Sequence, residues 1–356
     1  MKQLSQVYLI LLLLAALPGC SSMRYYTQAI SGHVSLMMRS EPVENVLQHS
    51  DTPPELSRAL SSAQSARTFA EQTLRLPVDG AFSSFVALEH PWVVVNLVAA
   101  PEFSLTPKQW CYPFVGCQAY RGYFDLAMAK EAQRHFTNQG YDTFIGAVTA
   151  YSTLGWFDDL LHTGFTHLSE DRMIALMFHE LAHRVVYLNG DTAFNESFAT
   201  AVELEGLRLW LEREGSPEAF ERALLRLEHR NRTLELVGDT SETLRRLYAQ
   251  QNELDRIQLR QRKQKTLDDL ASQYEALAAR YPEPGPLGSA PVQLNNAKLA
   301  LFQQYNQHVP AFRQLLKESD FDFERFYETV SRLSDQPETE RKDTLNALSE
   351  RFHEHF

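Results

Sequence analysis

The stretch from His179 to His183 reads HExxH and lies within an apolar run. Four residues make about one turn of an α-helix, so His179 and His183 would project from one face and could bind the same metal ion. Glu180 directly follows the first histidine and could activate a zinc-bound water. Two neutral imidazoles, an open coordination position and a carboxylate base are what a zinc hydrolase requires. The motif therefore predicts one Zn²⁺ per chain.

A zinc site of this type needs a third protein ligand, which is often a glutamate from the next helix. Glu196 follows His183 by thirteen residues and is the predicted third ligand. Glu203 lies about two turns further along the same helix face, where it is either the alternative ligand or the partner of a ring N–H of a ligating histidine. Asp191 is a second candidate for that supporting role, and its alternative is a turn or capping residue.

Two helices are expected to carry these side chains. The apolar residues 173–178 lead into the motif, and the turn sequence at 189–191 should end the first helix. Helical character returns from Asn195. Neighbouring helices joined by a short turn tend to be antiparallel and in contact, so Glu196 should face both histidines. The alternative, two histidines satisfied at the edge of a core, explains neither Glu180 nor Glu196.

The segment 179–206 resembles the bacterial "predicted aminopeptidase" lipoproteins, zinc peptidases of the gluzincin type. Further matching stretches are residues 110–117, 120–124 and 150–159. The resemblance implies a metallopeptidase that acts on peptide substrates, and the family's name implies cleavage at free N-termini. The chain departs from better-known gluzincins at one point, because their third-ligand glutamate lies further downstream than Glu196 does here.

Gluzincins have an edge strand upstream of the HExxH helix that runs along the substrate, and residues 147–157 occupy the corresponding place here. An edge strand presents unpaired N–H and C=O groups, to which an extended peptide can add as another strand. The resemblance therefore predicts that residues 149–156 bind substrate, with Thr149, Ala150 and Ser152 among them. The alternative is a plain structural strand and turn.

Peptide hydrolysis also needs a hydrogen-bond donor for the oxyanion, and an aminopeptidase needs a carboxylate for the substrate's α-ammonium group. Tyr151 is the first candidate for the donor. Asp158 and Asp159 are candidates for the carboxylate, although turn formation or helix capping would also explain them. Further candidate donors, for which packing or a surface hydrogen bond is the alternative, are Tyr120, Tyr123, Arg121, His162 and His167.

The N-terminus predicts export and a lipid anchor. Residues 1–19 contain Lys2 and an apolar run of signal-peptide length, which is too short to span a membrane comfortably. Residues 17–20 resemble a lipobox, so cleavage before Cys20 would leave an acylated cysteine. Ser21 replaces the aspartate expected for inner-membrane retention, which favours the outer membrane, with the chain facing the periplasm. The alternative is an ordinary signal peptide.

Cys111 and Cys117 are the two other cysteines, and they lie six residues apart in a predicted loop. Export permits a disulfide between them, whereas a thiolate metal site would need tighter ligand pairing. The formal net charge of −11 argues against non-specific binding to nucleic acid.

The predicted fold class is α+β and predominantly helical, with a zincin-like catalytic core and a small sheet. We expect a tether over residues 20–45, the metallopeptidase core over 46–212, and a helical region packed on that core over 213–356. Strands are predicted at 92–99 and 141–151, and mixed or helical structure at 119–138. Helical segments are predicted at 55–76, at 218–280 as a helical hairpin, and at 292–333, with a break at 282–286.

The predicted function is zinc-dependent hydrolysis of peptide bonds in the cell envelope by an aminopeptidase. The alternatives are an endopeptidase of the same fold and a non-catalytic envelope lipoprotein that binds a protein partner. Glu180 favours an enzyme, since a binding module has no need for that carboxylate. No GxSxG motif is present, which disfavours a serine hydrolase of the α/β type.

Overall fold

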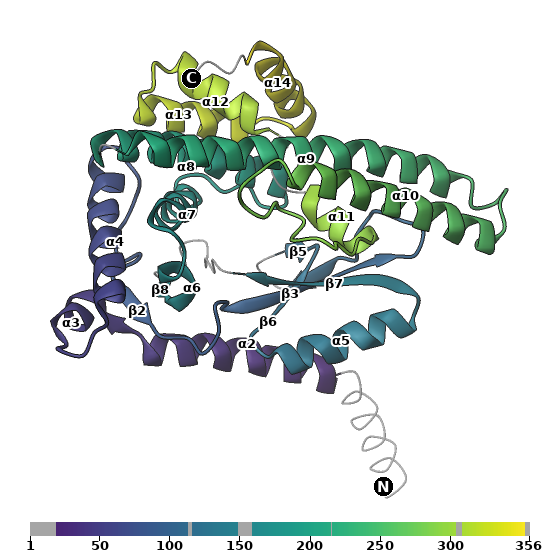
Figure 1. Cartoon of the computed structure of the whole chain (residues 1–356), viewed down its shortest axis with the longest axis horizontal. Coiled ribbons are helices and arrows are strands. Elements are labelled where there is room, and N and C mark those ends of the chain that lie inside the picture. Colours follow the sequence, from purple (N-terminus) through teal and green to yellow (C-terminus); the bar gives the residue numbers. More distant parts are fainter. Residues whose placement is uncertain (1–18, 113–115, 149–158, 215, 304–307, 353–356) are drawn as a thin grey trace, which may run out of the picture.

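The computed structural model describes residues 19–112, 116–148, 159–214, 216–303 and 308–352 (Figure 1). The strands are short: β1 (Glu41–Pro42), β2 (Ser84–Val86), β3 (Val94–Pro101), β4 (Trp110–Tyr112), β5 (Gly116–Gln118), β6 (Arg121–Tyr123), β7 (Tyr141–Val148) and β8 (Leu161–His162). The N-terminal helices are α2 (Gly19–Arg39), α3 (Val43–Gln48), α4 (Pro54–Gln72), α5 (Leu126–Asn138) and α6 (Thr163–Thr166). The later helices are α7 (Glu170–Ala182), α8 (Thr192–Glu214), α9 (Pro217–Ala249), α10 (Arg256–Ala278), α11 (Asn296–Gln303), α12 (Val309–Glu318), α13 (Phe323–Ser334) and α14 (Glu338–Arg351). The predicted α+β, predominantly helical class is confirmed.

The main sheet has the strand order β6-β3-β7, and both pairings are antiparallel. Side chains alternate between the faces of a strand, and β3 is apolar on both. Val95 and Leu97 pack with the residues of α5, whereas Val98 and Ala100 pack with Ala297 of α11. Helices on both faces explain why β3 is apolar at nearly every position, with Asn96 as the exception.

The largest buried cluster surrounds α7 and α8. It draws residues from α4, α7, α8, α12, α13 and α14, from Val43 to Leu348. Aromatic rings connect these helices, since Phe198 of α8 packs against Phe312 of α12 and Phe326 of α13. The cluster includes residues on both sides of the predicted boundary at 212, so the two regions share one core.

The predicted helical hairpin at 218–280 is formed by α9 and α10, which lie side by side below α12, α13 and α14 in the upper half of Figure 1. Lys263 of α10 ties this hairpin to the main sheet. Its Nζ lies 2.6 Å from Asp142 Oδ2 of β7 and donates to the carbonyl of Glu102 at 2.9 Å. The Asp142 carboxylate also accepts from the backbone N–H of Asn296, at the start of α11. Buried charges need such partners, and these join three elements.

Much of the segment 20–45, the expected tether, forms α2, with Tyr25 and Leu36 buried. One expectation about local structure is wrong. Cys111 and Cys117 lie in strands β4 and β5 rather than in a loop. They face each other in the antiparallel register and are joined by a disulfide.

Candidate metal centre

Helix α7 carries the HExxH motif beside the core. Glu170 and Asp171 occupy its first turn, where negative charge complements the helix dipole. Met173, Ile174, Met177, Phe178 and Leu181 are buried in the main cluster. This apolar stripe fixes the rotation of the helix, so that the other face, with His179, is turned towards α8.

The structure corrects where α7 ends. The helix stops at Ala182, seven residues before the turn sequence that was expected to end it. The chain then forms tighter turns of the 3₁₀ type. The backbone N–H groups of Arg184 and Val185 donate to the carbonyls three residues earlier, at 3.1 and 2.9 Å. His183 is the capping residue, and its N–H still bonds to the carbonyl of His179. The one-turn relation of the two histidines is therefore kept.

Asn195 holds the connection between α7 and α8 closed. Its side chain accepts from the Leu188 N–H and donates to the Leu188 carbonyl, both at 2.8 Å. Asn195 is 2 % exposed, so water does not replace these bonds. Glu196 is the next residue along α8, and its direction depends on this contact.

Asp191 has a structural role that differs from the predicted support of a metal ligand. Its Oδ1 accepts from the N–H of Phe194 at 3.0 Å, which caps α8 three residues earlier than the predicted helix start. Its Oδ2 pairs with Arg341 of α14 at 3.0 Å. The turn and capping alternative is the one that the structure shows.

His179, His183 and Glu196 meet in one group that could hold a metal ion. The Nε2 atoms of the two histidines lie 3.2 Å apart. Glu196 Oε2 lies 3.2 Å from His179 Nε2, and Glu196 Oε1 lies 3.8 Å from His183 Nε2. Donors bound tetrahedrally to one zinc ion at about 2.1 Å lie roughly 3.4 Å apart. The donor set and its spacing both fit zinc.

Glu203 lies on the other side of the first imidazole. The N–H at Nδ1 of His179 donates to Glu203 Oε2 at 3.0 Å. This contact leaves the Nε2 lone pair free to face His183 and Glu196, as a ligating histidine requires. The two glutamates therefore have different positions: Glu196 lies on the ligand side and Glu203 on the supporting side. The Nδ1 of His183 is buried and has no hydrogen-bond partner among the described residues.

Burial and close charges shift the pKa values of this group. Burial lowers the pKa of His179, but the hydrogen bonds with Glu196 and Glu203 outweigh it and raise the pKa to about 10. Burial lowers the pKa of His183 to about 4. The hydrogen bond from His179 holds the pKa of Glu196 below its usual range against the effect of burial. A proton on His179 thus balances the carboxylates, and a metal ion would compete with that proton.

Glu180 is 9 % exposed and projects from the next position of α7. Burial raises the pKa of its carboxyl group to about 8, and the nearby carboxylates of Asp159, Glu196 and Glu203 act in the same direction. A divalent cation at the histidines would oppose this shift, since opposite charge favours the ionised carboxylate. Asp159 is buried, and it lies close enough to Glu180 for its charge to raise the pKa of the Glu180 carboxyl group. The backbone carbonyl of Asp159 accepts a hydrogen bond from the N–H of Phe82.

Other predicted site residues are dispersed. Tyr120 lies within electrostatic reach of Glu180 and Glu196. Tyr123 is buried near α5, Arg121 stacks over Tyr25, and His162 caps α6 by accepting from Gly164. His167 is exposed at the end of α6. Thr149, Ala150, Tyr151, Ser152 and Asp158 lie outside the described residues.

Two residues of this neighbourhood were not predicted. The ring of Tyr187 lies 6.4 Å from that of His183, edge to face, and its pKa is raised by burial and by Glu196. Tyr187 follows His183 by four residues, and this spacing could have indicated that the two side chains are neighbours. Arg230 of α9 lies close enough for its charge to lower the pKa of Glu196. No local pattern connects Arg230 with Glu196, which lies 34 positions earlier in the chain.

The family described as "Putative aminopeptidase" matches residues 24–345. The chain belongs to this family. The match covers most of the sequence, from within α2 to within α14, and it confirms the resemblance to an aminopeptidase family. No curated protein and no solved structure matches the chain. The family description indicates a peptidase, which agrees with the predicted peptide hydrolysis.

Replacing Asn195 with alanine should destabilise the fold and weaken metal binding. Two buried hydrogen bonds to Leu188 are lost, which should lower the free energy of unfolding by about 2 kcal/mol. Thermal unfolding and zinc titration would measure both effects. Asn189→Ala is the control, because Asn189 is exposed in the same connection. Equal melting temperatures for the two variants would contradict this account.

Replacing Glu203 with glutamine should weaken zinc binding by roughly 10- to 100-fold, the usual effect of removing the carboxylate behind a ligating histidine. The fold should be retained, because the amide has the same shape. Competition with a chromophoric chelator would give the affinity. Glu212→Gln, on the same helix with a side chain 70 % exposed, should leave it unchanged. An affinity for zinc that is the same in Glu203→Gln as in the wild type would refute the supporting role.

Proposed function

We propose that this protein is a zinc-dependent aminopeptidase of the cell envelope. The observation that carries the proposal is the convergence of His179, His183 and Glu196, with Glu180 buried beside them. Three protein ligands leave a coordination position open, which distinguishes a catalytic zinc site from a closed structural one. The arrangement of motif helix, second helix and small sheet supports a zincin-like core.

When bound, zinc would act as a Lewis acid on the scissile carbonyl and lower the pKa of a coordinated water. Glu180 takes the proton of the attacking water and passes it to the leaving amine. Its burial keeps the carboxylate poorly solvated, so that it is a better base than an exposed one. Glu203 keeps the imidazole of His179 in the tautomer that leaves Nε2 free.

The oxyanion needs a donor that remains protonated at neutral pH. We assign this role to Tyr120, because burial raises the pKa of its hydroxyl to about 12 and the hydroxyl lies within electrostatic reach of Glu196 and Glu180. Tyr151, the first choice from sequence, stays a prediction. Asp159 is the proposed partner of the substrate's α-ammonium group, since it lies buried near Glu180.

Elemental analysis and a peptidase assay test the enzyme. Purified protein should contain about one zinc ion per chain, and His179→Ala should lose it. Glu180→Gln should keep zinc but lose at least a hundredfold in kcat, because a general base contributes that much. Wild-type protein without zinc, or a Glu180→Gln variant with full activity, would overturn the mechanism.

Paired substrates test the aminopeptidase assignment. Peptides with a free amino terminus should be cleaved, and the same peptides with a blocked terminus should not. Equal cleavage of both would indicate an endopeptidase. Zinc binding without cleavage of either would favour the envelope scaffold.

The location at the envelope rests on the N-terminus. No helix in the described part of the chain is both long and apolar enough to cross a membrane. Helix α2 begins beside the proposed acylation site Cys20 and carries an exposed apolar stripe of Met23, Ile30, Val34 and Met38. A stripe of this kind can lie in a lipid surface, which supports a lipid anchor.

Mass spectrometry of the mature N-terminus tests the anchor. The expected product begins at Cys20 and carries acyl chains, and Cys20→Ser should leave the protein unacylated and unattached to membranes. A mature chain that begins elsewhere, or one with an unmodified Cys20, would indicate that residues 1–19 are an ordinary signal peptide without a lipid anchor.

A further inference from the structure

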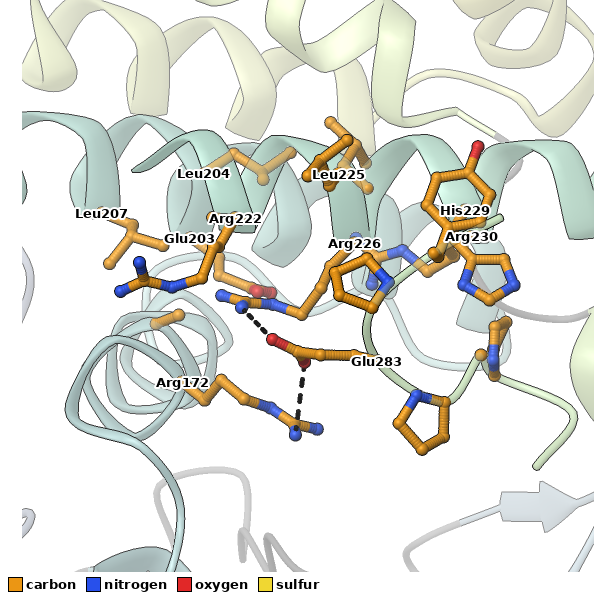
Figure 2. Close-up of a pocket in the computed structure, with 18 of the residues that line it drawn as sticks. Arg172, Glu203, Leu204, Leu207, Arg222, Leu225, Arg226, His229, Arg230 and Glu283 are labelled. Atoms are coloured by element: carbon orange, nitrogen blue, oxygen red, sulfur yellow. Dashed lines mark hydrogen bonds and ion pairs between the residues drawn. The ribbon is translucent and has the colours of Figure 1, made fainter. Parts of the chain in front are cut away.

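A pocket of about 450 Å³ lies between α7, α8, α9 and the segment 281–286 (Figure 2). Its apolar walls include Leu176 of α7, Leu204 and Leu207 of α8, and Leu225 and Leu227 of α9. Such walls would suit the aliphatic part of a peptide. Arginines make up four of the eight polar residues that line the pocket, whereas the candidate metal centre holds histidines and glutamates.

The pocket adjoins the metal centre. Glu203 lines it and also accepts the hydrogen bond from Nδ1 of His179. Leu176 and Arg172 precede His179 on one face of α7, and at 1.5 Å per residue they lie about 5 and 10 Å from it along the helix. An extended peptide advances about 3.3 Å per residue. A substrate cleaved at the metal centre could therefore reach the pocket with a group within three residues of the scissile bond.

Four guanidinium groups surround this space. Arg222, Arg226 and Arg230 repeat every four residues along α9, which places them on one face, and Arg172 comes from α7 (Figure 2). Arg226 pairs with Asp171 at 2.5 Å and with Glu283 at 3.1 Å. Within the described part of the chain, Arg222 and Arg230 form no hydrogen bond or ion pair. Two cations therefore face the pocket without a direct partner.

The carboxylate of Glu283 is already bound by arginines in the pocket, which indicates the kind of ligand that the pocket can accept. This carboxylate lies between two guanidiniums, 3.1 Å from Arg226 and 3.9 Å from Arg172. It comes from the proline-rich segment 282–286, whose fixed backbone angles hold it there. The pocket lining has four guanidinium groups and two carboxylates, those of Glu203 and Glu283. Positive charge therefore exceeds negative charge in the lining, which favours an anion.

We propose that this pocket binds a carboxylate of the peptide substrate through Arg222 or Arg230, so that the enzyme prefers acidic peptides. The inference rests on the proposed peptidase function and names its substrate class. The carboxylate has two possible sources, an acidic side chain near the scissile bond or the C-terminus of a short peptide. Guanidinium groups suit either, because they bind carboxylates in a planar, charge-assisted arrangement.

Binding to the zinc-loaded Glu180→Gln protein tests this without turnover. The probes are tripeptides ending in glutamate or glutamine, each as the free acid and as the C-terminal amide, measured by isothermal titration calorimetry. At least one carboxylate should tighten binding about tenfold, since a charge-assisted hydrogen bond has that effect. Comparing side chain with terminus identifies the source.

Arginine variants in the same background locate the carboxylate. Arg222→Gln or Arg230→Gln, whichever removes the guanidinium that binds the carboxylate, should remove most of the preference for acidic peptides, and Arg222→Gln should leave the affinity for neutral peptides unchanged. Arg232→Gln is the matched control on α9, because Arg232 pairs with Glu235 and does not line the pocket. Glu283→Gln should have the opposite effect and tighten the acidic peptides, because it releases Arg172 and Arg226.

Equal affinities for acidic and neutral peptides, or binding of neither, overturn the proposal. So does a preference that survives in both arginine variants. Inorganic phosphate that displaces acidic peptides at a lower concentration than free acetate would indicate a phosphate site instead. Hydrolysis is measured separately on the wild type, so acid-selective binding without cleavage would sink the peptidase function alone.

Discussion

The packing of α7 against α8 is the contact on which the rest of the site depends. Gly206 permits this approach, because a Cβ there would lie 2.9 Å from Phe178 of α7 and 2.7 Å from Leu74. The two helices bury an apolar face in a shared core, and their polar faces turn towards each other. Carboxylates and imidazoles are thereby held where water is scarce. Asn195 closes the connection and fixes the position at which Glu196 meets the histidines.

Charge balance is the second constraint. Three glutamates lie buried or half-buried around two histidines, and carboxylates in such a place need a cation. Without metal, the raised pKa of His179 indicates that a proton provides it. The arginines of α9 also contribute positive charge. The charge of Arg230 lowers the pKa of Glu196, and Arg226 forms an ion pair with Asp171 at the start of α7. An acidic chain thus concentrates positive charge beside the candidate metal centre.

Local patterns predicted much of this arrangement. The period of the α-helix alone places His179 and His183 on one face, and the second helix brings Glu196 to them as expected. The hairpin of α9 and α10 and the strands β3 and β7 follow from hydrophobic patterning. The errors are local too: α7 ends early through tighter hydrogen bonds, and Asp191 caps α8 and pairs with α14. Both depend on competition between neighbouring contacts, which a single sequence does not display.

The identity and spacing of the candidate metal ligands can be read from the sequence, because they depend on chemistry within one or two helical turns. The packing of α7 on α8 sets which glutamate faces Nε2 of His179 and which lies behind the ring, since both glutamates occupy the same face of α8. The tertiary structure also brought Tyr120, Asp159 and the arginines of α9 to the site. These residues come from segments distant in sequence, and only the packing of helices on a common core sets the distances between them.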